Sequence, residues 1–190
     1  FVRQGRWHGS WADSRIAEEV TGSTLGIVGL GRIGGAVARR ARGFDLRVLY
    51  TKRTRVETDL GEFRELDALL AEADLVTLHV PLTPETHGLI DARRLELLRV
   101  GSCLVNTARG EIVDQDALVA ELVSGRIRAG LDVFVGEPEV PAELLGLENV
   151  VLTPHLGSAS RQAREAMSRL VVDNLLAVER GKPPLTPVWN

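Results

Sequence analysis

A glycine-rich turn at residues 29–34 is the feature that most constrains how this chain can fold. Its three glycines occupy the first, third and sixth positions, and the apolar run 24–28 leads into it without a break. Residues 36–42 have the composition of a helix. The apolar run suits a strand of a parallel sheet, because helices cover such a sheet on both faces. A strand, the pattern G-x-G-x-x-G and a helix, in this order, are typical of a dinucleotide-binding unit.

Each glycine of the turn has its own expected task. Gly29 would make the tight turn, Gly31 would let the backbone approach a pyrophosphate, and Gly34 would let helix and strand pack closely. The helix N-terminus would supply free N–H groups and partial positive charge to the phosphates. The alternative interpretation is a tight strand-to-helix turn without a ligand.

The rest of the chain alternates between strand and helix patterns, with Asp91 and Asp114 as expected N-caps. This alternation predicts an α/β fold, a Rossmann-type doubly wound parallel sheet with helices on both faces. We expect an extended arm at 1–22, a dinucleotide-binding domain at 23–180 and a tail at 181–190. The expected strands are 24–28, 46–50, 74–80, 102–107, 127–133 and 149–153, and the expected helices are 33–43, 63–73, 91–98, 115–124 and 158–180.

Composition narrows the classes of partner and compartment. The chain has 190 residues, 44% of them hydrophobic, and a formal net charge of −3. This charge gives no sign of a nucleic-acid or membrane partner, and no apolar run is long enough to span a membrane. The single cysteine, Cys103, excludes an internal disulfide and suits a reducing compartment, so we expect a cytoplasmic location. No metal is expected.

A basic turn follows the second expected strand, and ligands of open parallel sheets bind beyond the carboxyl ends of the strands. The turn 51–55 contains Thr51, Arg53 and Thr54, and no acidic residue occurs before Glu57. An acidic side chain here commonly binds the ribose 2′-hydroxyl of NAD, whereas arginine can grip the 2′-phosphate of NADP. The turn therefore favours NADP(H), with NAD(H) as the second choice. A solvated basic turn is the alternative.

An arginine, a carboxylate and a histidine follow three later strands. Arg109 follows the fourth, Glu137 the fifth and His155 the sixth. Together they suit hydride transfer to or from a 2-keto or 2-hydroxy acid. Arg109 would orient the substrate carboxylate, His155 would exchange a proton with the carbonyl oxygen, and Glu137 would keep the imidazole protonated. Taken singly, the three are also compatible with a surface charge, a turn residue before proline and a neighbour of a helix cap.

Several motifs in order along the chain resemble those of the D-isomer-specific 2-hydroxyacid dehydrogenases, and most of all the glyoxylate/hydroxypyruvate reductase branch. They cover nearly the whole chain and are specific to the family when taken together. These motifs are 25–34, 79–86, 106–110, 130–134 with 137–138, and 153–157.

The resemblance implies reduction of a small 2-keto acid, glyoxylate or hydroxypyruvate, with Arg109, Glu137 and His155 as the catalytic set. It implies that Asp132 meets the nicotinamide carboxamide, and that members form homodimers through this domain. In some members a tryptophan of the arm lines the neighbour's substrate pocket, which makes Trp11 a candidate. The remaining implied cofactor contacts are Gly31, Arg32 and Ile33 at the pyrophosphate, together with Val80, Pro81, Thr86, Thr107 and Gly157.

The family also implies an N-terminal substrate domain, which is missing from this chain. We therefore expect a cofactor-binding domain with its tail, and activity of the piece alone is in doubt because half of the cleft is absent. The family is similar to corepressors that keep both fold and catalytic triad, so a non-catalytic NAD(H)-sensing scaffold is the alternative function. The basic turn favours the NADPH-using enzyme over that scaffold.

Overall fold

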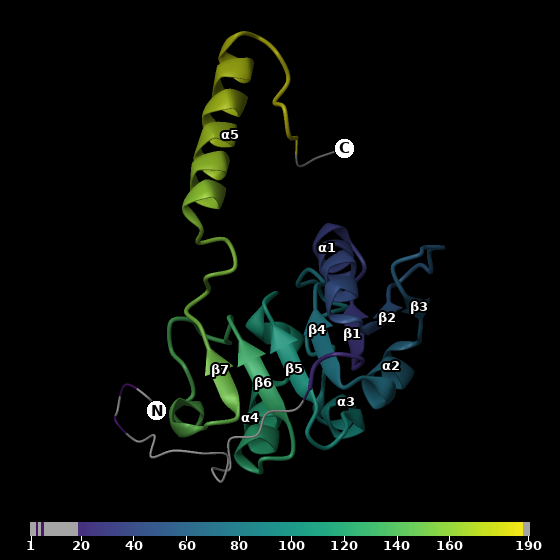
Figure 1. The fold of residues 1–190 in the computed structure, drawn as a ribbon. Helices are drawn as coiled ribbons and strands as arrows, with labels where there is room; N and C mark the ends of the chain where they lie inside the picture. The colour runs from purple at the N-terminus through teal and green to yellow at the C-terminus, as the bar shows by residue number, and fades with distance from the viewer. Residues whose placement is uncertain (1–2, 4, 6–18, 188–190) are drawn as a thin grey trace.

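A single parallel sheet forms the centre of the molecule, as the computed structural model of residues 3, 5 and 19–187 describes it (Figure 1). Its strand order is β3-β2-β1-β4-β5-β6-β7, so the chain builds outward from β1 on one side and then on the other. This confirms the predicted fold class. The strands are β1 (Thr24–Val28), β2 (Arg47–Thr51), β3 (Glu62–Phe63), β4 (Leu75–Leu78), β5 (Cys103–Asn106), β6 (Arg128–Leu131) and β7 (Val150–Leu152).

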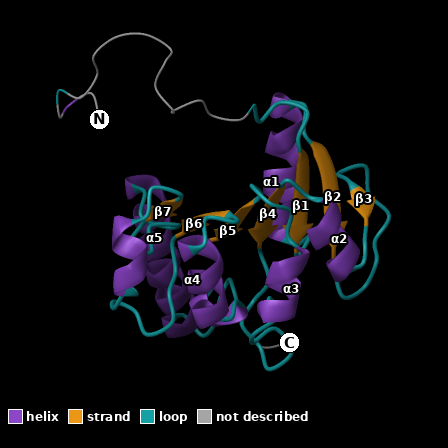
Figure 2. Cartoon of the chain, turned by 90° about the horizontal axis from the view of Figure 1, so that it is seen from below, coloured by secondary structure: helices purple, strands orange, loops and turns teal. Residues whose placement is uncertain are grey.

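Helices lie on both faces of this sheet, with α1 on one face and α2, α3 and α4 on the other (Figure 2). The predicted N-caps are in place, because Asp91 accepts a hydrogen bond from Arg94 N at 2.8 Å and Asp114 accepts one from Ala117 N at 3.1 Å. The helices are α1 (Arg32–Ala41), α2 (Leu66–Glu72), α3 (Ala92–Leu97), α4 (Gln115–Val123) and α5 (Arg161–Glu179), with short 3₁₀ turns η2 (Arg42–Phe44), η3 (Gly110–Ile112) and η4 (Ala142–Gly146).

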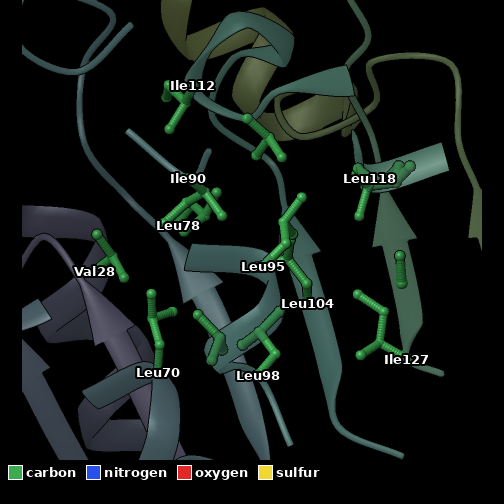
Figure 3. Close-up of a cluster of buried hydrophobic side chains, with 14 of the residues drawn as sticks. Val28, Leu70, Leu78, Ile90, Leu95, Leu98, Leu104, Ile112, Leu118 and Ile127 are labelled. Carbon is green, nitrogen blue, oxygen red and sulfur yellow. The ribbon is translucent and has the colours of Figure 1, made fainter. Parts of the chain in front are cut away.

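Two apolar clusters fill the space between sheet and helices. Successive residues of β1 divide between them: Ile27 packs in the cluster with α1, and Val28 packs in the larger cluster on the opposite face. This follows from the two-residue period of a strand. The larger cluster takes Leu70, Leu95 and Leu118 from α2, α3 and α4 (Figure 3). Burial on both faces explains why the strands read as continuous apolar runs.

The expected helix at 63–73 begins later than predicted. Phe63 belongs instead to β3, which pairs with β2, and α2 begins at Leu66. The Phe63 ring packs edge-on against Tyr50, with ring centroids 5.7 Å apart. A strand of two residues is too short for its alternating pattern to show in the sequence. Because Phe63 also fits the apolar spacing of the helix that follows, the sequence assigned it to that helix.

The crevice for a ligand lies where the strand order reverses, between β1 and β4. Val28 and Leu78 are register partners at the carboxyl ends of these two strands, and His79 N donates to Val28 O at 2.7 Å. The glycine turn after β1, the proline loop after β4 and the loop after β5 therefore share one edge of the sheet. Figure 1 shows this edge on the side from which α5 extends.

Helix α5 stands apart from the sheet (Figure 1). Ser160 caps it by accepting from Ala163 N at 3.1 Å, and the tail is pinned to it where Thr186 N donates to Asn174 Oδ1 at 3.1 Å. Its apolar residues are largely exposed, as with Leu175 at 65%. No helix in the described part of the chain is long and apolar enough to cross a membrane.

Candidate active site

The glycine turn has the geometry of a close junction between strand and helix. Gly29 has φ 99°, a conformation that favours glycine, and a Cβ there would lie 2.7 Å from His79 O. A Cβ on Gly34 would lie 2.2 Å from Gly29 O, so a side chain at this position would push the helix off the turn. A Cβ on Gly31 would meet no described atom within 4 Å, so the backbone of Gly31 faces open space.

A cleft of about 880 Å³ opens in front of this turn. It draws its lining from the turn, from the proline loop after β4 and from the loop after β5. Seven of the predicted site residues line it. They are Gly31, Arg32, Ile33, Val80, Pro81, Thr107 and Arg109.

The basic turn after β2 lies outside the lining of the cleft. Arg53 and Thr54 are exposed and Thr51 is half-buried. The positive charge of Arg53 reaches the opposite loop, because it helps to lower the pKa of the Glu85 carboxyl, whose main cause of lowering is a hydrogen bond from Thr83. Arg55 lies over the ring of Phe63 at 5.6 Å, so this arginine is partly engaged within the domain.

Thr86 also lies outside the lining, and its hydroxyl closes the proline loop. Thr86 Oγ1 donates to Pro81 O at 2.6 Å and accepts from Thr83 N at 2.8 Å. These two bonds hold the loop that forms one wall of the cleft. The structure therefore gives Thr86 a role in shaping this wall, and its expected contact with a cofactor stays a prediction.

Glu137 and His155 come from different loops and meet in a hydrogen-bonded pair. Their atoms Oε2 and Nδ1 are 2.8 Å apart, and Glu137 Oε1 also accepts from Phe134 N at 2.9 Å. These bonds, first that from His155, hold the pKa of Glu137 below its usual value, and the positive charge of Arg109 adds to the effect. Glu137 is therefore ionised near neutral pH and can only accept, so His155 donates through Nδ1 and its Nε2 is left for a substrate.

His155 sits on a strained backbone. Its φ is 52°, in the left-handed region that few residues other than glycine adopt, although histidine is among the more tolerant. His155 N donates to Asp132 O at 2.9 Å, which ties the loop after β7 to the loop after β6. Strain of this kind persists where the surroundings fix it, and it is common at functional sites.

Asp132 organises the loop that carries His155. The residue is 5% exposed, and its carboxylate accepts from the Thr153 hydroxyl, from Leu156 N at 2.7 Å and from Gly157 N at 2.9 Å. Burial raises the pKa of this carboxyl, but the three hydrogen bonds outweigh burial and leave the pKa below its usual value. The sequence signals Asp132 only as a residue after a strand, whereas its contacts make it the support of the His155 loop.

Arg109 projects from an extended backbone at the edge of the cleft, and its side chain is exposed. Asn106, which is 2% exposed, fixes this segment from below: its side chain donates to Arg109 O at 2.8 Å and accepts from Ala108 N at 3.0 Å. Arg109 lines the cleft, and its charge acts on Glu137. Arg109, the Glu137–His155 pair and the glycine turn thus occupy the same edge of the sheet.

Comparison with known proteins places this arrangement in a family. The family model for the D-isomer specific 2-hydroxyacid dehydrogenase, NAD binding domain, matches residues 1–157. The chain belongs to this family. One relative, the glyoxylate reductase of Pyrococcus horikoshii, is 51% identical over 200 residues, covering 99% of this chain and 59% of the relative.

Solved structures of the family have the same fold. A protein from Thermus thermophilus superposes with a TM-score of 0.94 at 47% identity, over 99% of this chain and 60% of that one. An NADPH-dependent glyoxylate/hydroxypyruvate reductase from Sinorhizobium meliloti, solved with NADP and malonate, gives a TM-score of 0.91 at 42% identity, over 98% and 59%. The chain thus spans about three fifths of the length of the relatives it matches.

One predicted site residue lies outside the described part of the chain, and two residues that support the site could not be identified from the sequence. Trp11 and most of the expected arm lie outside the described residues, so the suggested contact with a neighbouring subunit stays a prediction. Asn106 and Thr153 were not singled out, although both support the site. Asn106 ends a buried strand at a point where no helix needs a cap. A polar side chain in such a place must find hydrogen-bond partners, and this is the one signal that could have identified it.

The Asp132 contacts predict a dependence of stability on pH. An acid whose pKa is lowered in the folded state contributes stability above its ordinary pKa, about 3.9, and this contribution is lost as the pH falls through the lowered value. Asp132→Asn should therefore destabilise the domain at neutral pH, by about 1–3 kcal/mol, because an amide cannot accept all three bonds. Thermal unfolding between neutral and acidic pH should show the two proteins converging as the pH falls. A difference in melting temperature between the two proteins that stays constant across this pH range would contradict the assigned role of Asp132.

Proposed function

We propose that this chain is the coenzyme-binding part of an enzyme that reduces a small 2-keto acid, glyoxylate or hydroxypyruvate, with NADPH. The observation that carries the proposal is the Glu137–His155 pair at 2.8 Å, beside a cleft that Arg109 and the glycine turn line. The names of the relatives support the same reaction: the protein from Pyrococcus horikoshii is a glyoxylate reductase, and that from Sinorhizobium meliloti is an NADPH-dependent glyoxylate/hydroxypyruvate reductase.

The residues present fit a dinucleotide. Gly31 leaves its backbone open to the cleft, and the N-terminus of α1 directs free N–H groups to the same place. When bound there, a nicotinamide coenzyme supplies the hydride, which is the difficult step of the reaction. Pro81 and Val80 would form a rigid wall of the cleft, and Thr107 would lie opposite the turn. Asp132 and Gly157, which are also proposed to contact the coenzyme, belong to the two loops that hold His155.

The remaining chemistry belongs to three side chains. The Arg109 guanidinium would bind the substrate carboxylate with two hydrogen bonds and draw electron density from the adjacent carbonyl. As hydride reaches the carbonyl carbon, the imidazolium of His155 would give its Nε2 proton to the carbonyl oxygen, which yields the 2-hydroxy acid and a neutral imidazole. Glu137 would hold Nδ1 and stabilise the charged ring through the 2.8 Å contact.

The proposal includes the part of the enzyme that this chain does not contain. The chain spans about three fifths of its relatives, and the apolar side of α5 is exposed, with Val171 at 60% and Leu175 at 65%. Surfaces of this kind commonly mark an interface. We propose that a substrate domain completes the cleft, that the enzyme is a homodimer in the cytoplasm, and that Trp11 reaches the partner subunit.

The deciding experiment is a panel of small 2-keto acids, with NADPH and with NADH, on the full-length enzyme. Oxidation of NADPH with glyoxylate or hydroxypyruvate is the expected result. Failure to turn over any small 2-keto acid while still binding coenzyme would overturn the reductase and leave the NAD(H)-sensing scaffold.

The preference for NADPH gives a second test. Arg53→Asp should shift the ratio of kcat/KM values from NADPH toward NADH, because a carboxylate repels the 2′-phosphate of NADP and can bind the ribose 2′-hydroxyl of NAD. Steady-state kinetics with both coenzymes measures the ratio. Arg180→Asp makes the same change of charge at the end of α5 and should leave it unchanged. An unaltered ratio in the Arg53 variant would remove the assigned role of the basic turn.

A further inference from the structure

The loop that carries Arg109 and the loop that carries Glu137 are in direct backbone contact. A Cβ on Gly110, the residue after Arg109, would lie 2.2 Å from Phe134 C and 2.5 Å from Val135 N. The space left between α4 and the two loops is about 10 Å³, which is no more than one water needs. Any movement of the Phe134–Val135 peptide is therefore transmitted to both loops of the site.

Two side chains hold the backbone around Phe134 through two consecutive N–H groups, which belong to the peptide units on either side of its Cα. Glu137 Oε1 accepts from Phe134 N at 2.9 Å, and Gln115 Oε1 accepts from Val135 N at 2.8 Å. Glu137 thus joins Phe134 N to His155, one through each oxygen of its carboxylate. The position of the Glu137–His155 pair therefore follows the position of this backbone segment, and Gln115 ties the segment to α4.

Gln115 is well placed for this task. It is the first residue of α4, and Asp114 caps that helix by accepting from Ala117 N. The side chain therefore starts from a helix that packs in the main core through Leu118. Anchors on rigid elements hold a site more closely than anchors on loops.

We propose that Gln115 is a positioning residue for the Glu137–His155 pair, and the proposal rests on the function proposed above for that pair. Gln115 touches neither the cleft nor the pair itself. It acts through the Val135 amide, which is the next amide along the backbone from the Phe134 N–H that Glu137 accepts. What the position requires is an acceptor oxygen at the length of a glutamine side chain.

This role is separable from general stability. Val135 is 39% exposed, so its N–H can find water when Gln115 is removed, and the free energy of unfolding should change little. Catalysis should respond more strongly, because small displacements of a reacting group are costly. A misplacement of about 1 Å can lower the rate by about 100-fold.

The test compares three variants of the full-length enzyme. Gln115→Ala should lower kcat by about 10- to 100-fold, with the KM for NADPH and the melting temperature near those of the wild type. Gln115→Glu keeps the acceptor and should recover most of the lost kcat. Asp116→Ala, an exposed change on the next residue of α4, should leave kcat unchanged. Wild-type kcat in the alanine variant, or a glutamate variant as impaired as alanine, would overturn the proposal.

A readout without turnover separates this inference from the proposed reaction. In the wild type, NMR should show a protected Val135 amide and a downfield Nδ1 proton of His155, as its bond to ionised Glu137 requires. Gln115→Ala should speed exchange of the Val135 amide and move or broaden the His155 signal, whether or not any keto acid is reduced. If both signals stay as in the wild type, Gln115 does not position the pair, even where the reductase activity is established.

Discussion

We expect replacement of His155 to lower kcat of the full-length enzyme by about two to four decades, the usual contribution of a positioned acid–base group. The loss should fall on kcat because the proposed proton transfer occurs in the transition state, while coenzyme binding at the glycine turn should be left intact. Stopped-flow or steady-state oxidation of NADPH with glyoxylate measures it. His87→Ala is the matched control, since His87 is an exposed histidine of the proline loop that the proposed mechanism does not use.

The choice of variant matters because of the backbone at this position. His155 has φ 52°, and alanine in the left-handed region adds strain to the loss of the imidazole. Asparagine tolerates this conformation, and its side-chain amide cannot donate a proton as an acid near neutral pH. If the loss of activity comes from the missing proton donor, His155→Asn and His155→Ala should therefore be equally inactive. An asparagine variant with near wild-type kcat would show that the alanine effect was one of folding, and it would remove His155 as the proton donor.

The edge of the sheet at which these residues meet could be predicted from the sequence. Arg109, Glu137 and His155 each follow an apolar run, and the carboxyl ends of parallel strands lie at one edge, so their proximity follows from the order of strands and helices alone. The resemblance to the family supplied their roles, and membership of that family is confirmed by the match over residues 1–157. The 2.8 Å contact between Glu137 and His155 is a feature of the structure that strand order could not supply.

The supports of the site could not be predicted, and the reason is physical. Gln115 and Val135 are 20 residues apart, and their bond joins a helix to a loop whose path is set by tertiary packing. Asn106 bonds backbone groups two and three residues away, and Asp132 bonds backbone N–H groups of Leu156 and Gly157 more than 20 residues away. Backbone partners of this kind carry no trace in residue type. Sequence periods report on burial and on strand or helix. They do not report which amide a buried side chain will reach.

Neighbouring glycines of α1 should respond to alanine with opposite signs. Gly34→Ala places a Cβ 2.2 Å from Gly29 O, a backbone atom of the turn, and 3.1 Å from Ile27 Cγ2. Gly29 O cannot move without shifting the turn, so we expect a loss of about 1–3 kcal/mol of folding free energy, as overpacked sites show. Coenzyme binding should weaken with it, since the displaced helix N-terminus is the expected phosphate site.

Gly35→Ala is the matched control, one residue further along the same helix. Its added Cβ would meet Arg39 Nη1 and Leu60 Cδ1 at 3.6 Å, which is ordinary contact distance. Alanine is favoured over glycine in a helix interior by about 0.5–1 kcal/mol, so this variant should be more stable than the wild type. Denaturant unfolding and NADPH titration of both proteins test the pair. Equal effects of the two substitutions would mean that helix propensity decides at both positions, and that the close approach of Gly34 to the turn does not hold the helix in place.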